Sequence, residues 1–175
     1  KKEGVNGIVL DVRDDGGGSL KTVVDIAGLF IEQGPIVQIK SAAGKKEVLY
    51  DRDKKVQWDG PLVVMVNNFS ASASEILAAA IQDYKRGIVI GSSSTYGKGT
   101  VQRPIPFGRP IDFYSSRTEF GAVSLTFQKF YRVNGGSTQL EGVKSDIVMP
   151  DRFSFMQTGE KDEKSAGRVR LNSGP

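Results

Sequence analysis

Three short apolar runs constrain the fold of this chain most, because each has the length of a strand and is too short for a helix. They are Gly7–Val12, Pro61–Val66 and Gly87–Gly91. Near-continuous apolar runs of this length are typical of buried strands in a sheet covered by helices. Segments with apolar residues at helical spacing lie between the runs. This β-α-β order predicts an α/β fold with a mixed, largely parallel sheet flanked by helices.

Two helices are expected between these strands. The first follows Ser19 as its cap and ends at Gly34-Pro35, with apolar positions at Val23, Val24, Ile26, Ala27, Leu29 and Phe30. The second covers Ser72 to Tyr84, with apolar positions at Ile76, Leu77, Ala80 and Ile81.

The remaining segments predict further strands and a polar tail. Residues 36–39 and 47–50 read as strands around an Ala43-Gly44 turn. From Val101 the chain becomes β-rich, and residues 123–133 end at the turn Asn134-Gly135-Gly136. We expect residues 1–150 to form one core. Residues 151–175 then form a polar tail, or the start of a following region, with three apolar anchors: Phe153, Phe155 and Met156.

The chain contains neither histidine nor cysteine. A nucleophilic hydrolase built from it cannot use a Ser-His-Asp triad or a Cys-His pair, and would need serine with lysine as its base. Disulfides and thiolate metal sites are excluded, and no cofactor is expected. The net charge of +4 comes from lysines and arginines spread along the chain, so nucleic acid is not an expected partner. No apolar run reaches the length of about 18 residues that would span a membrane.

Three serines stand where the second apolar strand passes into the second helix, in the segment Phe69-Ser70-Ala71-Ser72-Ala73-Ser74-Glu75. The first N–H groups of a helix lack partners within the helix, so they can hold an anion beside a serine placed there. The N–H that follows a nucleophile can also stabilise an oxyanion. The alternative is a helix cap of small residues without chemistry, and this segment alone does not decide between the two.

A single lysine, Lys98, lies in a loop between Gly97 and Gly99, and Gln102 follows four residues later. An isolated loop lysine is usually solvated, with a pKa of about 10.4 that keeps it charged near pH 7. Burial lowers the pKa of a lysine, which can then act as a base. The glycines permit a backbone path that turns the lysine inward, and Gln102 could orient its amine.

The turn Gly16-Gly17-Gly18 follows the first strand, so we expect it at the same sheet edge as the serine and lysine segments. Its N–H groups could complete an oxyanion hole. An ordinary turn that only glycine tolerates would explain the same residues.

The segment from Gly91 to Thr100 also resembles a phosphate-binding P-loop, but it departs from that motif in two ways. Its glycines enclose five residues rather than four, and Gly99 stands where Ser or Thr should follow the lysine. The next segment, 101–106, contains two prolines and cannot start the long helix that should face a phosphate. A nucleotide is therefore not expected.

Together these segments resemble the catalytic core of the C-terminal processing proteases, and most closely the bacterial tail-specific branch. The resemblance covers roughly residues 5–150. It rests on Leu10–Arg13 with the triple glycine and on segments 28–31, 34–38, 69–84, 96–102, 128–139 and 146–150.

The resemblance implies a serine endopeptidase with a Ser-Lys dyad. It assigns the nucleophile to Ser72, the base to Lys98 and a supporting role to Gln102. The rival interpretation is a catalytically inactive peptide-binding module on the same fold.

The resemblance also assigns the oxyanion hole to the N–H of Ala73 and to a glycine of the Gly17-Gly18 pair. Asp83, three turns below the serine on the helix, is expected to support the site rather than to react. The chain departs from the family at Asp14-Asp15, where relatives usually have asparagine, and in the loop before Lys98, which is one residue longer.

A ClpP/crotonase-like α/β core, with a β-rich C-terminal part, is the fold that the resemblance implies. It also implies a location in the bacterial periplasm or cell envelope, protein or peptide substrates with apolar C-termini, and an adaptor lipoprotein as a partner. The family carries a PDZ domain and an N-terminal helical region. Neither is recognisable in these 175 residues, so we expect a fragment of a longer protein.

Overall fold

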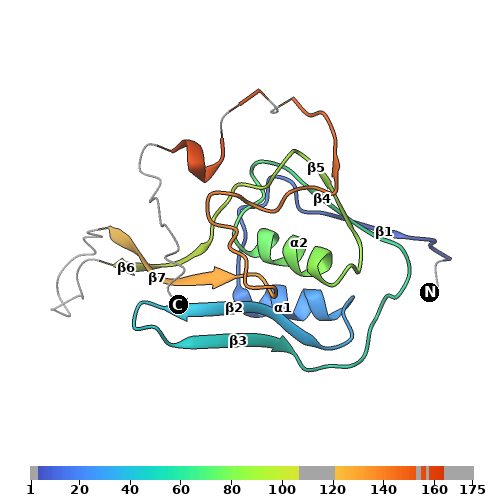
Figure 1. The fold of residues 1–175 in the computed structure, drawn as a ribbon, viewed down its shortest axis with the longest axis horizontal. Coiled ribbons are helices and arrows are strands. Elements are labelled where there is room, and N and C mark those ends of the chain that lie inside the picture. The colour runs from blue at the N-terminus through green and yellow to red at the C-terminus, as the bar shows by residue number, and fades with distance from the viewer. Residues whose placement is uncertain (1–3, 107–120, 153–154, 157, 164–175) are drawn as a thin grey trace, which may run out of the picture.

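A computed structural model describes residues 4–106, 121–152, 155–156 and 158–163 of the chain. Its strands form two sheets (Figure 1). The parallel sheet has the order β1-β4-β5-β8, with bounds Ile8–Asp11, Leu62–Val66, Ile88–Gly91 and Ile147–Val148. The antiparallel sheet has the order β3-β2-β7-β6, with bounds Lys46–Asp51, Gly34–Ser41, Ala122–Tyr131 and Thr100–Pro106. The expected α/β class is confirmed, with parallel and antiparallel strands in different sheets.

Two helices, α1 (Leu20–Gly28) and α2 (Ala73–Asp83), lie between the two sheets (Figure 1). The cap of α1 is Ser19, as expected, and its hydroxyl accepts a hydrogen bond of 3.3 Å from the N–H of Thr22. Every residue of α2 from Ala73 to Ile81 is buried. A helix that is apolar on all sides is stable only between two covering layers, which is the position that α2 occupies.

Among the described residues, the helices lie on one face of the parallel sheet, so β1 and β5 are less buried than their apolar runs predicted. Alternate side chains of β4, those of Leu62, Val64 and Val66, are buried in the core. On the neighbouring strands, Val9 is 62% exposed and Ile88 is 46% exposed. Strands β1, β4 and β5 follow one another across the sheet in chain order. Because crossovers between parallel strands are right-handed, α1 and α2 then lie on the same face of the parallel sheet.

The first helix also ends earlier than expected. Its last residue is Gly28, and the residues that were expected to stop it, Gly34 and Pro35, are the first two of β2. The strand requires glycine at its first position. The φ of Gly34 is +150°, and a Cβ atom there would collide with the Tyr84 hydroxyl. No helix among the described residues is long and apolar enough to cross a membrane.

In the described part of the C-terminal tail, the chain is attached by polar contacts, and two of the three apolar anchors expected from the sequence are exposed. Phe155 is 94% exposed, Met156 is also exposed, and Phe153 lies outside the described residues. The attachment is instead a short 3₁₀ helix, η1 (Glu160–Asp162). The N–H of Glu160 donates to the carbonyl of Tyr96 at 2.8 Å, next to the lysine loop.

Candidate active site

Three loops meet at one end of the molecule because they follow strands that end at the same sheet edge. They are the glycine turn after β1, the serine segment after β4 and the lysine loop after β5. Together with the start of β6 they enclose a hollow of about 240 Å³. Its walls include five of the residues predicted to form the site: Gly17, Gly18, Ser72, Lys98 and Gln102.

Ser72 occupies a sharp turn between β4 and α2. Its φ of 58° and ψ of −113° are unusual for a residue with a side chain. Such strain persists only where the surroundings hold it, and it is concentrated at functional sites. The backbone N–H of Ser72 donates to the carboxylate of Glu75 at 2.8 Å, which fixes the turn.

The structure distinguishes the other two candidate serines from Ser72. The Ser70 hydroxyl is fully buried and donates to the carbonyl of Val12 at 2.7 Å. The Ser74 hydroxyl is also buried and donates to the carboxylate of Asp15 at 2.8 Å. Of the three serines, Ser72 is the one that lines the hollow.

The glycine turn presses directly against the serine segment. A Cβ atom at Gly17, whose φ is +96°, would lie 2.6 Å from the carbonyl oxygen of Ala71 and 2.7 Å from the nitrogen of Ala73. Only glycine therefore permits this approach. The Gly17 N–H donates to Asp15 at 3.0 Å. Within the described part of the chain, the N–H groups of Gly18 and Ala73 donate to no other group, so they are free for an oxyanion.

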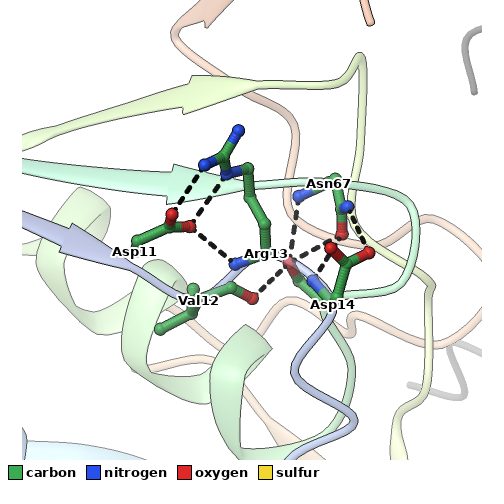
Figure 2. A network of polar contacts seen from close by, with 6 residues as sticks. Asp11, Val12, Arg13, Asp14 and Asn67 are labelled. Carbon is green, nitrogen blue, oxygen red and sulfur yellow. Dashed lines mark hydrogen bonds and ion pairs between the residues drawn. The ribbon is translucent and has the colours of Figure 1, made fainter. Parts of the chain in front are cut away.

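The unusual aspartates hold the glycine turn in place. The Asp14 N–H donates to the side chain of Asn67 at 3.0 Å, and the Asn67 amide donates back to the Asp14 carboxylate at 2.8 Å (Figure 2). The Arg13 guanidinium contacts the Asp11 carboxylate at 2.7 Å, and this contact lowers the pKa of the Asp11 carboxyl (Figure 2). The Asp15 carboxylate accepts bonds from within the turn and from α2.

Glu75 is a central residue that the sequence reasoning missed. One oxygen of its fully buried carboxylate accepts bonds from the hydroxyl of Thr95 (2.6 Å) and the N–H of Gly97 (2.8 Å). The other accepts bonds from the N–H groups of Ser72 (2.8 Å) and Lys98 (2.9 Å). Burial raises the pKa of Glu75 to about 7, while the four donors act in the opposite direction. This carboxylate therefore ties the serine segment to the lysine loop.

The sequence does carry a signal for part of this contact. A serine followed three residues later by glutamate is typical of the start of a helix, where the carboxylate returns to the cap N–H. The pattern explains the bond between Glu75 and Ser72. It contains no information on the bonds across the site to the lysine loop.

The lysine loop is held from its other side by segment 138–143. The N–H of Gly99 donates to the Gln139 side chain at 3.0 Å, and the Thr138 hydroxyl donates to the carbonyl of Lys98 at 3.2 Å. The Lys98 side chain is partly buried and lines the hollow. A bulge between Val101 and Gln102 interrupts the pairing of β6 with β7. Bulges redirect side chains next to active sites, and Gln102 lines the hollow at this point.

Asp83 lies at the opposite end of α2 from Ser72 and does not line this hollow. It forms an ion pair of 2.6 Å with Arg132, and the two side chains are only 10% and 17% exposed. The amide of Asn134 also donates to Asp83 at 2.9 Å. The contacts of Asp83 thus join the end of α2 to the end of β7.

The described residues that line the hollow offer few reactive groups. Among the described residues that line it, Lys98 is the only one with an ionisable side chain. Within the described residues, no group of acidic side chains could hold a metal ion. Among the described residues, the hollow therefore combines a strained serine, one amine and the free N–H of Gly18, and the free N–H of Ala73 directly follows the serine in the chain.

Residues 1–149 match peptidase family S41, and the chain belongs to this family. The fold and the resemblance recognised in the sequence are thereby confirmed. Over 161 residues the chain is 48% identical to a tail-specific protease of Haemophilus influenzae, and this alignment covers 91% of the chain and 22% of the relative. It is 36% identical to a carboxy-terminal-processing protease of Bartonella bacilliformis, over 95% of the chain and 37% of the relative.

A solved structure shows the same fold. A photosystem II D1 C-terminal processing protease aligns with a TM-score of 0.69 at 32% identity, over 85% of this chain and 36% of its own. The chain thus spans between about a fifth and two fifths of the length of these relatives.

Proposed function

We propose that this chain is the catalytic core of a serine endopeptidase that uses a Ser-Lys dyad. The observation that carries the proposal is that Ser72 and Lys98 line one hollow, and that no other described side chain lining it is ionisable. Membership of a peptidase family and relatives named as C-terminal processing proteases support the same chemistry.

In the proposed reaction, the Ser72 hydroxyl oxygen attacks the scissile carbonyl carbon and its proton passes to the amine of Lys98. The N–H groups of Ala73 and Gly18 stabilise the oxyanion that forms. Lys98 then gives its proton to the leaving amine. Water releases the acyl group by the same steps, and Gln102 orients the amine. This assignment favours Gly18 over Gly17, whose N–H is already bonded to Asp15.

The substrates we propose are unfolded or C-terminally tagged envelope proteins with apolar C-termini. The edge strand β6 begins two residues after Lys98, so an extended peptide could pair with its outer edge. Pro104 and Pro106 lack N–H groups, which would limit that pairing to the first residues of the strand. A periplasmic or envelope location and an adaptor lipoprotein belong to the same proposal.

A fluorophosphonate probe distinguishes the dyad from an inactive peptide-binding module. We expect the full-length protein to be labelled at Ser72, as mass spectrometry of its peptides would show. Ser72→Ala should abolish labelling, whereas the exposed Ser93→Ala should keep it. Lys98→Arg should be labelled very slowly, because arginine keeps its proton and cannot act as a base. A well-folded wild-type protein that reacts no faster than Ser72→Ala would support the inactive module.

A further inference from the structure

A second hollow, of about 440 Å³, lies beside the first. The two hollows share Gly16, Lys98, Thr100 and Gln102 as walls. The second hollow is also lined by Phe69, Ala71, Tyr96, Glu160 and Glu163. A peptide held across Ser72 would therefore place a neighbouring side chain at this hollow.

The acidic wall of the second hollow is fixed to the core. The carbonyl of Tyr96 accepts a hydrogen bond of 2.8 Å from the N–H of Glu160, and the Tyr96 hydroxyl donates to the carboxylate of Glu163. Burial and the neighbouring Glu163 raise the pKa of Tyr96 well above its usual range, so the hydroxyl remains a donor. The N–H of Tyr96 donates to the carbonyl of Ser70 at 3.0 Å. Both glutamates are thus tied to the segment that carries the nucleophile.

One carboxylate oxygen of this wall lacks a partner. The Oε2 atom of Glu160 is buried and accepts no hydrogen bond among the described residues. Buried carboxylate oxygens are nearly always bonded, and leaving one without a donor is unfavourable. Lys98 does not supply the donor, because the ion pairs of the described residues do not include one between Lys98 and either glutamate.

The remaining walls indicate which donor would fit. Phe69 and Tyr96 contribute aromatic rings, against which an aliphatic stem can pack and a cation can be attracted. The two carboxylates can form charge-assisted hydrogen bonds with an ammonium or guanidinium group. An acidic side chain would be repelled by these carboxylates, and an apolar one would form no such bond with them. The hollow therefore suits a lysine or arginine side chain.

We propose that this second hollow is a specificity subsite, which takes a basic side chain close to the scissile bond of the substrate. The inference rests on the proposed function, because it needs a peptide positioned at Ser72. Glu160 and Glu163 lie beyond residues 1–149, the part that matches the family, so the acidic wall adds a preference that the family match does not contain. Selection for a basic residue would be combined with the recognition of an apolar C-terminus.

Binding to the full-length protein with Ser72→Ala tests the subsite without turnover. Fluorescent peptides would carry a single lysine at successive positions around a mapped cleavage site, with norleucine as the uncharged equivalent. We expect about tenfold tighter binding of lysine at one position. Glu160→Gln with Glu163→Gln should remove this preference and change the affinity for the norleucine peptide less than twofold. The preference should also weaken as salt increases from 50 to 500 mM.

Asp162→Asn is the matched control, because Asp162 lies in the same helical turn but does not line the hollow. It removes the same charge and keeps an oxygen for the N–H of Gly159, which Asp162 binds at 3.2 Å. A lysine preference that is absent, that survives in the double variant, or that Asp162→Asn abolishes equally would overturn the proposal. Cleavage by the wild-type protein tests the dyad separately. Absence of cleavage would therefore indicate a failure of the dyad assignment, and absence of the lysine preference a failure of the subsite.

Discussion

Ser70 stands two residues before Ser72, the proposed nucleophile, and its hydroxyl is buried. It donates to the carbonyl of Val12 and accepts a bond of 2.9 Å from the N–H of Asn67. Ser70→Ala should therefore lower the free energy of unfolding by about 1–3 kcal/mol, since it leaves buried groups without partners. Cleavage should persist at temperatures where the variant stays folded. Urea unfolding and a peptide-cleavage assay would check both effects, and loss of activity in a fully folded variant would contradict the structural role.

The raised pKa of Glu75 predicts that the stability of the protein depends on pH. Its folded-state pKa of about 7 lies above the ordinary value of 4.5, so between these values the folded protein binds more protons than the unfolded chain. The contribution of Glu75 to stability is therefore greatest below pH 4.5 and decreases as the pH rises towards 7. The free energy of unfolding of the wild type relative to Glu75→Gln should fall over this window, by at most about 3 kcal/mol.

Urea unfolding of both proteins from pH 4.5 to 7.5 measures this difference, because titrations common to both proteins cancel. A difference that rises with pH would mean that the four hydrogen bonds to the carboxylate outweigh its burial and keep it ionised. Activity of Glu75→Gln should be reduced in either case, because the amide cannot accept bonds from all four donors that link the two loops.

At the scale of elements, the ion pair between Asp83 and Arg132 joins α2 to β7. Asp83→Ala leaves a largely buried guanidinium without its partner, so we expect a loss of about 3 kcal/mol in unfolding free energy. Replacing both residues, with Asp83→Ala and Arg132→Met, should cost less than Asp83→Ala alone. Chemical denaturation of the three proteins checks the order. Equal stability of the wild type and Asp83→Ala would show that the pair does not hold the elements together.

At the scale of the whole molecule, the parallel sheet has one face without a covering layer among the described residues. The chain also spans only 22% and 37% of two of its relatives. We expect the isolated 175 residues to fold but to cleave poorly, because binding energy from remote parts of a substrate is lost. Cleavage of one unfolded substrate by this chain and by the full-length protein, at equal concentration, provides the test. Equal efficiency would mean that this core binds and cleaves without help.

The sequence by itself predicted most of the elements and named the candidate site residues. Apolar runs and helical spacing predict β1, β4, β5 and both helices, because burial of side chains depends on local periodicity. The absence of histidine directs attention to Ser72 and Lys98, and the resemblance to the family supports them. These features depend on residue types and on their order along the chain.

The tertiary structure decided what depends on contacts between distant segments. The three serines at the start of α2 are alike in sequence. In the structure, the Ser70 hydroxyl donates to the carbonyl of Val12 and the Ser74 hydroxyl donates to Asp15, whereas Ser72 lines the hollow. The role of Glu75 has the same origin, since its partners at residues 95–98 lie about twenty positions away. Hydrogen bonds across such separations leave no local period, so no pattern along the chain could reveal them.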